Sequence, residues 1–266
     1  MTQQKHTKVI SRNESFVDKT ITRIWHEKPS DDNPYITENC RCHGYDLLEL
    51  TKKRSFIDVL YLLFRGELPT KKEAQLLEHL MIALINPGPR HPATRAAMSA
   101  GVGKTDPAHI LPIGLTILGG NHLGASEIEP AMRFLRKNRK KPAKTIADEL
   151  LKNKIELELP GFGSHFNSIE IMPQKIANQI LELFDNCKTL EWANELINCM
   201  SEHNIGWLST GLAAAVFSDL GFQPRVGTGL YQLISAPGLL AHGIEMANKP
   251  ITAMPFISDE NYVIEK

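Results

Sequence analysis

The hydrophobic positions of this chain follow the spacing of helices over most of its length. From about residue 46 onward, apolar residues recur at intervals of three and four, and nothing shows a sustained period of two. Polar residues occupy the opposite faces of four amphipathic segments, at residues 128–138, 144–154, 174–186 and 190–203. We therefore expect an all-α protein in which these four helices face solvent.

Two further segments are apolar on nearly all sides and predict enclosed helices. They span residues 207–222 and 231–247, and such helices belong to a protein core or a subunit interface. Together with a helix expected near residues 106–119, the first of them leaves more apolar surface than a lone protomer should expose. We therefore expect a homodimer with an interface well above roughly 1,600 Å².

Capping residues mark where several helices begin. Thr70 and Glu73 have the spacing of a capping box, and Asp106 stands directly before Pro107, which suits a first helical position. The first 45 residues lack such signals and are rich in polar residues, proline and asparagine. We expect irregular structure or a short hairpin there.

A more polar helical block interrupts the apolar segments, which is the order that an inserted domain produces. The predicted small helical domain spans residues 126–203. The predicted large helical domain is formed by residues 1–125 and 204–266, with residues 1–45 as a mostly irregular N-terminal arm.

The charge balance argues against several classes of partner. Thirty basic and thirty acidic residues give a net charge of zero, so the chain lacks the electrostatic signature of a protein that binds nucleic acid or an anionic membrane. The basic run at residues 133–144 is a local exception, interpreted as a solvated helix end, with a phosphate-rich ligand as the alternative. The expected partners are small molecules or further subunits.

Cysteine spacing and the N-terminus indicate a reducing compartment. Cys40, Cys42, Cys187 and Cys199 fall in no zinc or redox spacing, so we expect no metal site. Residues 1–16 are polar, without the apolar centre of a signal peptide, and no apolar run has the length that spans a bilayer. We therefore expect a cytoplasmic protein.

One short segment is a candidate ligand loop. In LPGFGSHFNS, residues 159–168, two glycines bracket Phe162, and Ser164 and His165 follow between two helical patterns. Glycines in such a place let the backbone approach a ligand closely. The histidine is then a candidate for chemistry.

Six motifs, in order over about residues 42–247, resemble the citrate synthase family. They are CHGYDLLELTKKRSFIDVLYLLFRGELPT, INPGPRHPATRAAMSAG, ILGGNHLGA, PGFGSHF, HNIGWLSTG and APGLLAHGIE. The compact size and the C-terminal tail resemble the citryl-CoA lyase module of ATP citrate lyase within that family. The resemblance implies an all-α homodimer with the active site in the cleft between the large and the small domain.

In that family the chemistry makes or breaks a carbon–carbon bond beside a CoA thioester. An aspartate removes a proton from the acyl α-carbon, one histidine stabilises the enol, and another polarises the carbonyl under attack. The resemblance places the enol-stabilising histidine at His122, preceded by Asn121 in the substrate site. It also implies that Gly161, Phe162 and Gly163 approach a CoA thioester, which would be a substrate; no separate cofactor is expected.

The other catalytic positions of the family are substituted here. Gly206 occupies the position of the aspartate, Ser164 that of the second histidine, and Pro87 that of a substrate-binding histidine, while His165 stands in place of an arginine. The arginine clamp that holds the substrate carboxylates has no counterpart. We therefore expect no ordinary citrate synthase activity.

Three further residues could rebuild a substrate site. His91 and Arg95 flank the lost histidine position and could hold a carboxylate, or they could simply decorate the start of a helix. Arg225 could enter the site or lie at the surface. For His165, a one-residue shift of the glycine loop would return an imidazole to the cleft, and a solvent-facing histidine is the alternative.

These residues support two hypotheses. The first is a divergent enzyme that cleaves or forms a carbon–carbon bond through the enolate of a CoA thioester or related acyl substrate. His122 would stabilise the enolate, with His165 and Ser164 acting on the second reactant. Cleavage is favoured over condensation because it needs no α-carbon base. The alternative is a non-catalytic citrate synthase-like protein that binds a metabolite or a partner subunit.

Overall fold

The computed structural model describes residues 18–152, 159–255 and 257–265 of the 266-residue chain. The chain divides into two compact units, Met1–Ser55 and Phe56–Lys266. No helix in the described part of the chain is long and apolar enough to cross a membrane. The polar N-terminal residues 1–16 and the expected helix end at residues 153–154 lie outside the described residues.

The first unit contains a small antiparallel sheet. Strand β1 (Trp25–Pro29) pairs with β2 (Thr37–Cys42), and β2 pairs with the short strand β3 (Tyr45–Asp46). Helix α1 (Leu47–Lys53) follows directly. The hairpin expected as one alternative for the first 45 residues is therefore confirmed over residues 25–46.

The described residues of the second unit are helical apart from two short strands that pair with each other. Its elements are, in chain order, α2 (Phe56–Arg65), α3 (Lys71–Ala83), α4 (Pro92–Val102), α5 (Pro107–Leu118), η1 (Ala125–Glu127), α6 (Ile128–Asn138), α7 (Ala143–Lys152), β4 (Phe162–Gly163), α8 (Ile171–Leu183), α9 (Lys188–Met200), η2 (Ser201–His203), β5 (Gly206–Trp207), α10 (Ser209–Asp219), α11 (Pro224–Ala247), η3 (Ile251–Ala253) and η4 (Asp259–Asn261). The four expected amphipathic helices are α6 to α9, and the expected helical fold class is confirmed.

The predicted capping groups are in place at two helices. At α3 the Thr70 hydroxyl accepts the backbone N–H of Glu73, and the Glu73 carboxylate accepts the backbone N–H of Thr70. At α5 the Asp106 carboxylate accepts the N–H of Ala108, with Pro107 in the first turn. The Asp106 cap fixes where α5 begins, and the loop that carries His122 follows the end of α5.

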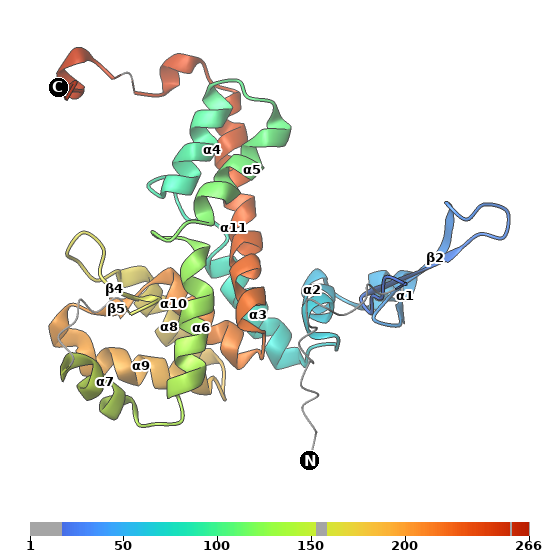
Figure 1. Cartoon of the computed structure of the whole chain (residues 1–266), viewed down its shortest axis with the longest axis horizontal. Helices are drawn as coiled ribbons and strands as arrows, with labels where there is room; N and C mark the ends of the chain where they lie inside the picture. Colours follow the sequence, from blue (N-terminus) through green and yellow to red (C-terminus); the bar gives the residue numbers. More distant parts are fainter. Residues whose placement is uncertain (1–17, 153–158, 256, 266) are drawn as a thin grey trace. The chain divides into compact units, whose positions relative to one another are not determined.

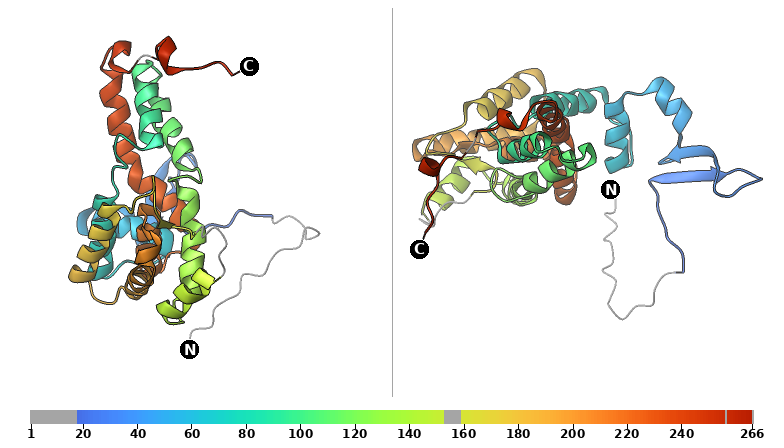
Figure 2. Two further views of the ribbon diagram at one scale, coloured as in Figure 1. Left: turned by 90° about the vertical axis from the view of Figure 1, so that its left-hand side faces the viewer. Right: turned by 90° about the horizontal axis from the view of Figure 1, so that it is seen from above.

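Helices α10 and α11 organise the second unit. Figures 1 and 2 show α4 and α5 lying beside α11, while α10 packs against α6 and α9. Every residue of α10 from Thr210 to Phe217 is buried, so the enclosed helix expected over residues 207–222 is confirmed. The apolar character of α10 therefore needs no partner subunit to explain it.

Helices α5 and α11 differ from α10 because they keep large apolar side chains at the surface. The exposed side chains are Ile113, Ile117, Leu233, Leu240 and Ile244. Residues 231–247 are thus not enclosed on all sides within the protomer. The apolar surface behind the predicted homodimer lies on α5 and α11, and the dimer itself stays a prediction.

Candidate active site

The loop between α5 and η1 carries His122. Gly119 ends α5, and its carbonyl accepts the hydroxyl of Ser126 at 2.5 Å, which closes the loop on itself. Leu123 has a φ of 57°, a left-handed conformation that is uncommon for a leucine. A residue in this conformation needs tertiary contacts to keep it there.

His91 supplies one of those contacts. Its Nδ1 accepts the N–H of Ala93 at 3.1 Å, which caps α4, and its Nε2–H donates to the carbonyl of Leu123 at 2.9 Å. Burial lowers the pKa of His91, which suits the neutral imidazole that this pair of bonds requires. Both ring nitrogens are therefore occupied in holding the His122 loop, and neither is free for the carboxylate that the sequence suggested.

A tight hairpin carries His165. Strand β4 pairs with β5, and beyond it the backbones of His165 and Ser168 exchange two hydrogen bonds, of 3.0 and 2.9 Å. Phe166 and Asn167 form the turn with φ of 51° and 59°, as two-residue hairpin turns require. The hairpin brings the ring of His165 to 5.8 Å from that of His122, edge to face.

The carboxylate of Glu170 fixes the orientation of His165. Its Oε1 lies 2.5 Å from Nδ1 of His165, and since an ionised carboxylate can only accept, Nδ1 carries the proton. In the neutral imidazole, Nε2 is then left as a hydrogen-bond acceptor. A histidine held in this way can act as a general base.

The two glycines of the candidate ligand loop have different roles. Gly161 has a φ of 81°, and a Cβ built on it would lie 2.6 Å from Cα of Gly211, so it serves close packing against α10. A Cβ on Gly163 would meet nothing within 4 Å, and Gly163 lines a cavity. Phe162 packs its buried ring against Trp207, with centroids 5.2 Å apart. Backbone approach to a ligand is thus possible at Gly163 rather than at Gly161.

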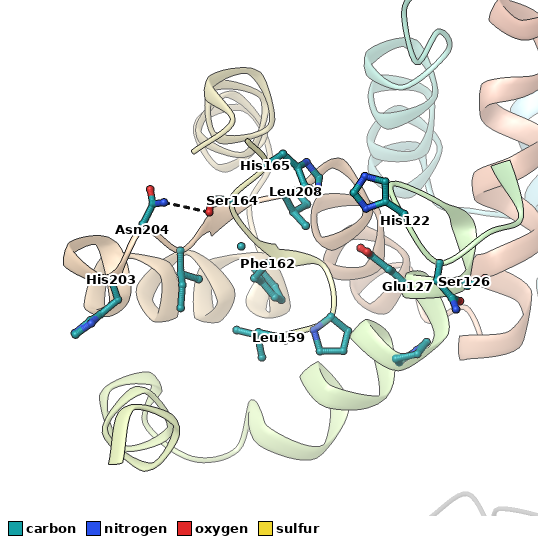
Figure 3. A pocket seen from close by; sticks show the side chains of 15 residues that line it. His122, Ser126, Glu127, Leu159, Phe162, Ser164, His165, His203, Asn204 and Leu208 are labelled. Carbon is teal, nitrogen blue, oxygen red and sulfur yellow. Dashed lines mark hydrogen bonds between the residues drawn. The ribbon is translucent and has the colours of Figure 1, made fainter. Parts of the chain in front are cut away.

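The two histidines stand in the shared wall of two adjoining cavities. The first cavity, of about 810 Å³, is lined by residues from the His122 loop, η1, the hairpin and the segment before β5. The second, of about 550 Å³, is lined from the start of α4, the hairpin, α10 and α11. His122, His165 and Leu208 line both. Figure 3 shows the two imidazole rings side by side above the first cavity.

Apart from His122 and His165, which line both, the sequence-predicted residues divide between these cavities, with Gly161 and Arg225 as exceptions. Asn121 and Ser164 line the first cavity, where the Ser164 hydroxyl accepts the amide of Asn204 at 3.1 Å. His91 and Arg95 line the second. Arg225 lines neither cavity; its side chain is 85% exposed, and its Nε lies 3.8 Å from Glu129.

Sequence reasoning missed two carboxylates at this site. Glu127 lines the first cavity, and its Oε2 accepts the hydroxyl of Thr210 at 2.7 Å. Glu170 lines the second and holds His165. Each lies five residues after the candidate histidine that it accompanies. A search for acidic residues shortly after each histidine would have found both.

Two more residues of the second cavity were also missed. Arg90 lies one position before His91 and brings a second cation beside Arg95. Tyr231 of α11 is almost fully buried, and burial together with the negative charge of the two site carboxylates raises its pKa. Tyr231 therefore stays a neutral phenol that can donate a hydrogen bond into the cavity.

The structure also explains why position 206 holds a glycine. A Cβ built on Gly206 would lie 2.3 Å from Cγ2 of Ile169. Ile169 follows the hairpin that carries His165, so its side chain occupies the space that a residue at position 206 would need. The glycine at position 206 and the placement of the hairpin are therefore coupled.

Comparison with known proteins agrees with this arrangement of helices. No family model matches the chain. A citrate/2-methylcitrate synthase of Bacillus subtilis is 29% identical over 162 residues, which is 58% of this chain and 42% of that protein. The matched region thus spans less than half the length of that relative.

Solved structures cover more of the chain. Citryl-CoA lyase from Hydrogenobacter thermophilus has a TM-score of 0.76 at 24% identity, covering 93% of this chain and 94% of its own. ATP citrate lyase from Methanothrix soehngenii has a TM-score of 0.70 at 18% identity, over 95% of this chain and 44% of its own. Citrate synthase from Thermotoga maritima has a TM-score of 0.52 at 16% identity, over 96% of both chains. In its ordered motifs, its sequence and its fold, the chain is similar to members of the citrate synthase family.

Proposed function

We propose that this protein is a carbon–carbon lyase that cleaves a CoA thioester, or a related acyl substrate, through an enolate. The observation that carries the proposal is the pair His122 and His165. Their ring centroids are 5.8 Å apart, and both side chains line the two adjoining cavities. One cavity can take the thioester and the other the group that leaves. Formation of the same bond is the reverse reaction at the same site.

The relatives support the substrate class. The structure of the Methanothrix soehngenii enzyme holds citrate and coenzyme A, and a Methanosaeta concilii ATP citrate lyase variant holds (3S)-citryl-CoA. A citrate synthase from Thermoplasma acidophilum holds carboxymethyl coenzyme A and oxaloacetate. These ligands belong to those proteins, and we carry over to this chain only the thioester class.

Cleavage assigns one proton role to each histidine. Nε2 of His165 takes the proton of a hydroxyl on the β-carbon, and the electrons of that O–H bond form a new carbonyl. The bond between the α- and β-carbons breaks, and its electron pair moves through the α-carbon to the thioester oxygen. His122 donates a hydrogen bond to that oxygen and stabilises the enolate.

The substrate that suits this site differs from that of a citrate synthase. Gly206 provides no carboxylate, and the side chain of Ile169 fills the space that a side chain at position 206 would need. The cations of the second cavity are Arg90 and Arg95, at the start of α4. We propose that they hold one carboxylate of the leaving group, with the phenol of Tyr231 donating to it.

The predicted domains fit this use of the cavities. Residues 1–125 with 204–266 would form the large domain and residues 126–203 the small one. The first cavity is lined from both: Asn121 and Leu208 come from the large domain, and Leu159 and Ser164 from the small one. The proposed active site is therefore the cleft between these two domains.

A homodimer belongs to the same proposal. Leu233 and Leu240 are exposed on α11, and they border an apolar groove of about 500 Å³ with Phe56 and Ile82. We expect light scattering at micromolar concentration to give the mass of two chains. Leu240→Glu should shift the protein toward the monomer, because it places a charge in that apolar surface. A wild-type monomer would contradict the homodimer.

A screen of thioesters tests the proposed activity. The purified protein is incubated with 3-hydroxyacyl-CoA thioesters that differ in their β-substituent, (3S)-citryl-CoA among them, and the products are followed by mass spectrometry. We expect acetyl-CoA or a related short thioester together with a 2-oxo acid or another carbonyl product. Binding without turnover of any thioester would favour the non-catalytic alternative, and absence of binding would overturn the proposed activity.

A further inference from the structure

The carboxylate that the family supplies from the Gly206 position has a replacement on another element. Cleavage leaves an enolate whose α-carbon must be protonated before the product is released, and condensation needs a base at the same carbon. His165 already serves the hydroxyl group, and Glu170 is engaged with His165. The group that exchanges a proton with the α-carbon must come from elsewhere in the cavity that holds His122.

Glu127 has the placement that this role requires. It ends η1, five residues after His122, and lines the first cavity with it. Figure 3 shows its carboxylate pointing toward the ring of His122. Its Oε2 accepts the hydroxyl of Thr210, a buried residue of α10, at 2.7 Å. Its Oε1 accepts no hydrogen bond from the described residues, so that oxygen can face a ligand.

We propose that Glu127 is the catalytic acid and base at the α-carbon of the thioester. The assignment rests on the proposed function, because it presupposes an enolate in the first cavity. In the cleavage direction the protonated carboxyl gives its proton to the α-carbon, and the enolate electrons form the new C–H bond. In the reverse direction the carboxylate removes that proton, and the C–H pair becomes the enolate that His122 stabilises. Thr210 is a positioning residue, since its hydroxyl holds one oxygen and directs the other.

Hydrogen exchange at the α-carbon tests this role without any second substrate. The protein is incubated with acetyl-CoA in deuterated water, and loss of the methyl signal is followed by proton NMR. We expect the wild type to exchange and Glu127→Gln to lose about a hundredfold or more in rate, because an amide cannot take the proton. Its affinity for acetyl-CoA, measured by calorimetry, should stay within about threefold, since the substitution removes a chemical step rather than binding.

Three further variants separate chemistry from structure. Thr210→Val should slow exchange about tenfold and Thr210→Ser should restore it, because only the hydroxyl directs the carboxylate. Glu129→Gln is the matched control: Glu129 lies on the first turn of α6, pairs with Arg133 and lines neither cavity. It should exchange like the wild type.

The outcomes distinguish this assignment from the proposed function. Exchange that survives Glu127→Gln overturns the assignment to Glu127 and leaves the proposed function standing. A wild-type protein that cleaves a thioester but exchanges no α-proton also overturns it. If the wild type neither binds nor turns over a thioester, both fail together.

Discussion

The two histidine loops are held in place by different means, and the contrast shows what a sequence motif does and does not specify. His122 sits in a loop kept in place from a distance, because His91 bonds to Leu123 from 32 positions away. His165 sits in a hairpin whose restraint is local, through Glu170 five residues later. The His122 loop is held by a residue far away in the chain. The His165 hairpin is attached to β5 through β4, but the ring of His165 is oriented within its own short segment.

The largest effect should come from removing either histidine. His122→Ala should lower thioester turnover by about a hundredfold or more, because the enolate loses its hydrogen-bond donor. His165→Ala should be damaging as well, through loss of the base, and Ser164→Ala should be milder. Steady-state kinetics on the thioester found in the screen measure all three. Normal turnover by His122→Ala would show that this loop is not the site of enolate stabilisation.

The next effect is on stability, and it compares Gly161, which packs against α10, with Gly163, which faces open space. Gly161→Ala should lower the free energy of unfolding by about 1–3 kcal/mol, because the new Cβ would meet Gly211 backbone atoms. Gly163→Ala is the matched variant and should change it by less than about 0.5 kcal/mol, since the space there is open. Chemical denaturation compares the two. Equal losses would mean that the glycines do not differ as described.

A third change tests the coupling between the hairpin and the glycine at position 206. Gly206→Asp should destabilise the protein by about 1–3 kcal/mol, because the new side chain overlaps Ile169. Adding Ile169→Ala should recover part of that loss, although it removes some apolar contact of its own. Additive losses in the double variant would show that the two positions do not share a space.

The smallest effect concerns the remote support of the His122 loop and its pH dependence. The folded state lowers the pKa of His91 by burial, so between the ordinary value of about 6.5 and the lower folded value the unfolded chain binds a proton that the folded chain does not. Stability should therefore be fully present above that window and fall as the pH is lowered through it. Denaturation at several pH values measures the slope.

Substitution isolates the contribution of this one histidine. His91→Gln should flatten the slope, whereas His109→Gln, an exposed histidine on α5, should leave it as in the wild type. The two variants each remove one histidine, so their difference reports on burial. An unchanged slope in His91→Gln would contradict the assignment of a buried, neutral imidazole.

Much of the fold could be predicted from the sequence, because the start of a helix and its amphipathic pattern depend on residues that are close together in the chain. The capping box of Thr70 and Glu73 and the amphipathic pattern of α6 depend on neighbours within one or two turns. The burial of α10 was also predictable, because its residues are apolar on every side. The exposed face of α11 was not, since apolar composition alone does not say which side another helix covers.

The candidate site could be predicted only as far as its histidines. Asn121, His122, Ser164 and His165 were found from ordered motifs, and all four line the first cavity. The role of His91 could not be found in this way, because it depends on a carbonyl that lies far away in the chain. The carboxylates were missed for another reason: Glu127 and Glu170 are ordinary residues until the fold aims them at a cavity.

The central claim is that His122 and His165 act together on one thioester, and a double-mutant cycle tests it most directly. Single-turnover cleavage is measured for the wild type, for each alanine variant and for the variant with both substitutions. Residues that act as a unit in one step are not additive, so the double variant should be about as slow as the slower single variant. Losses that multiply, or a wild type that cleaves no thioester, would contradict the account.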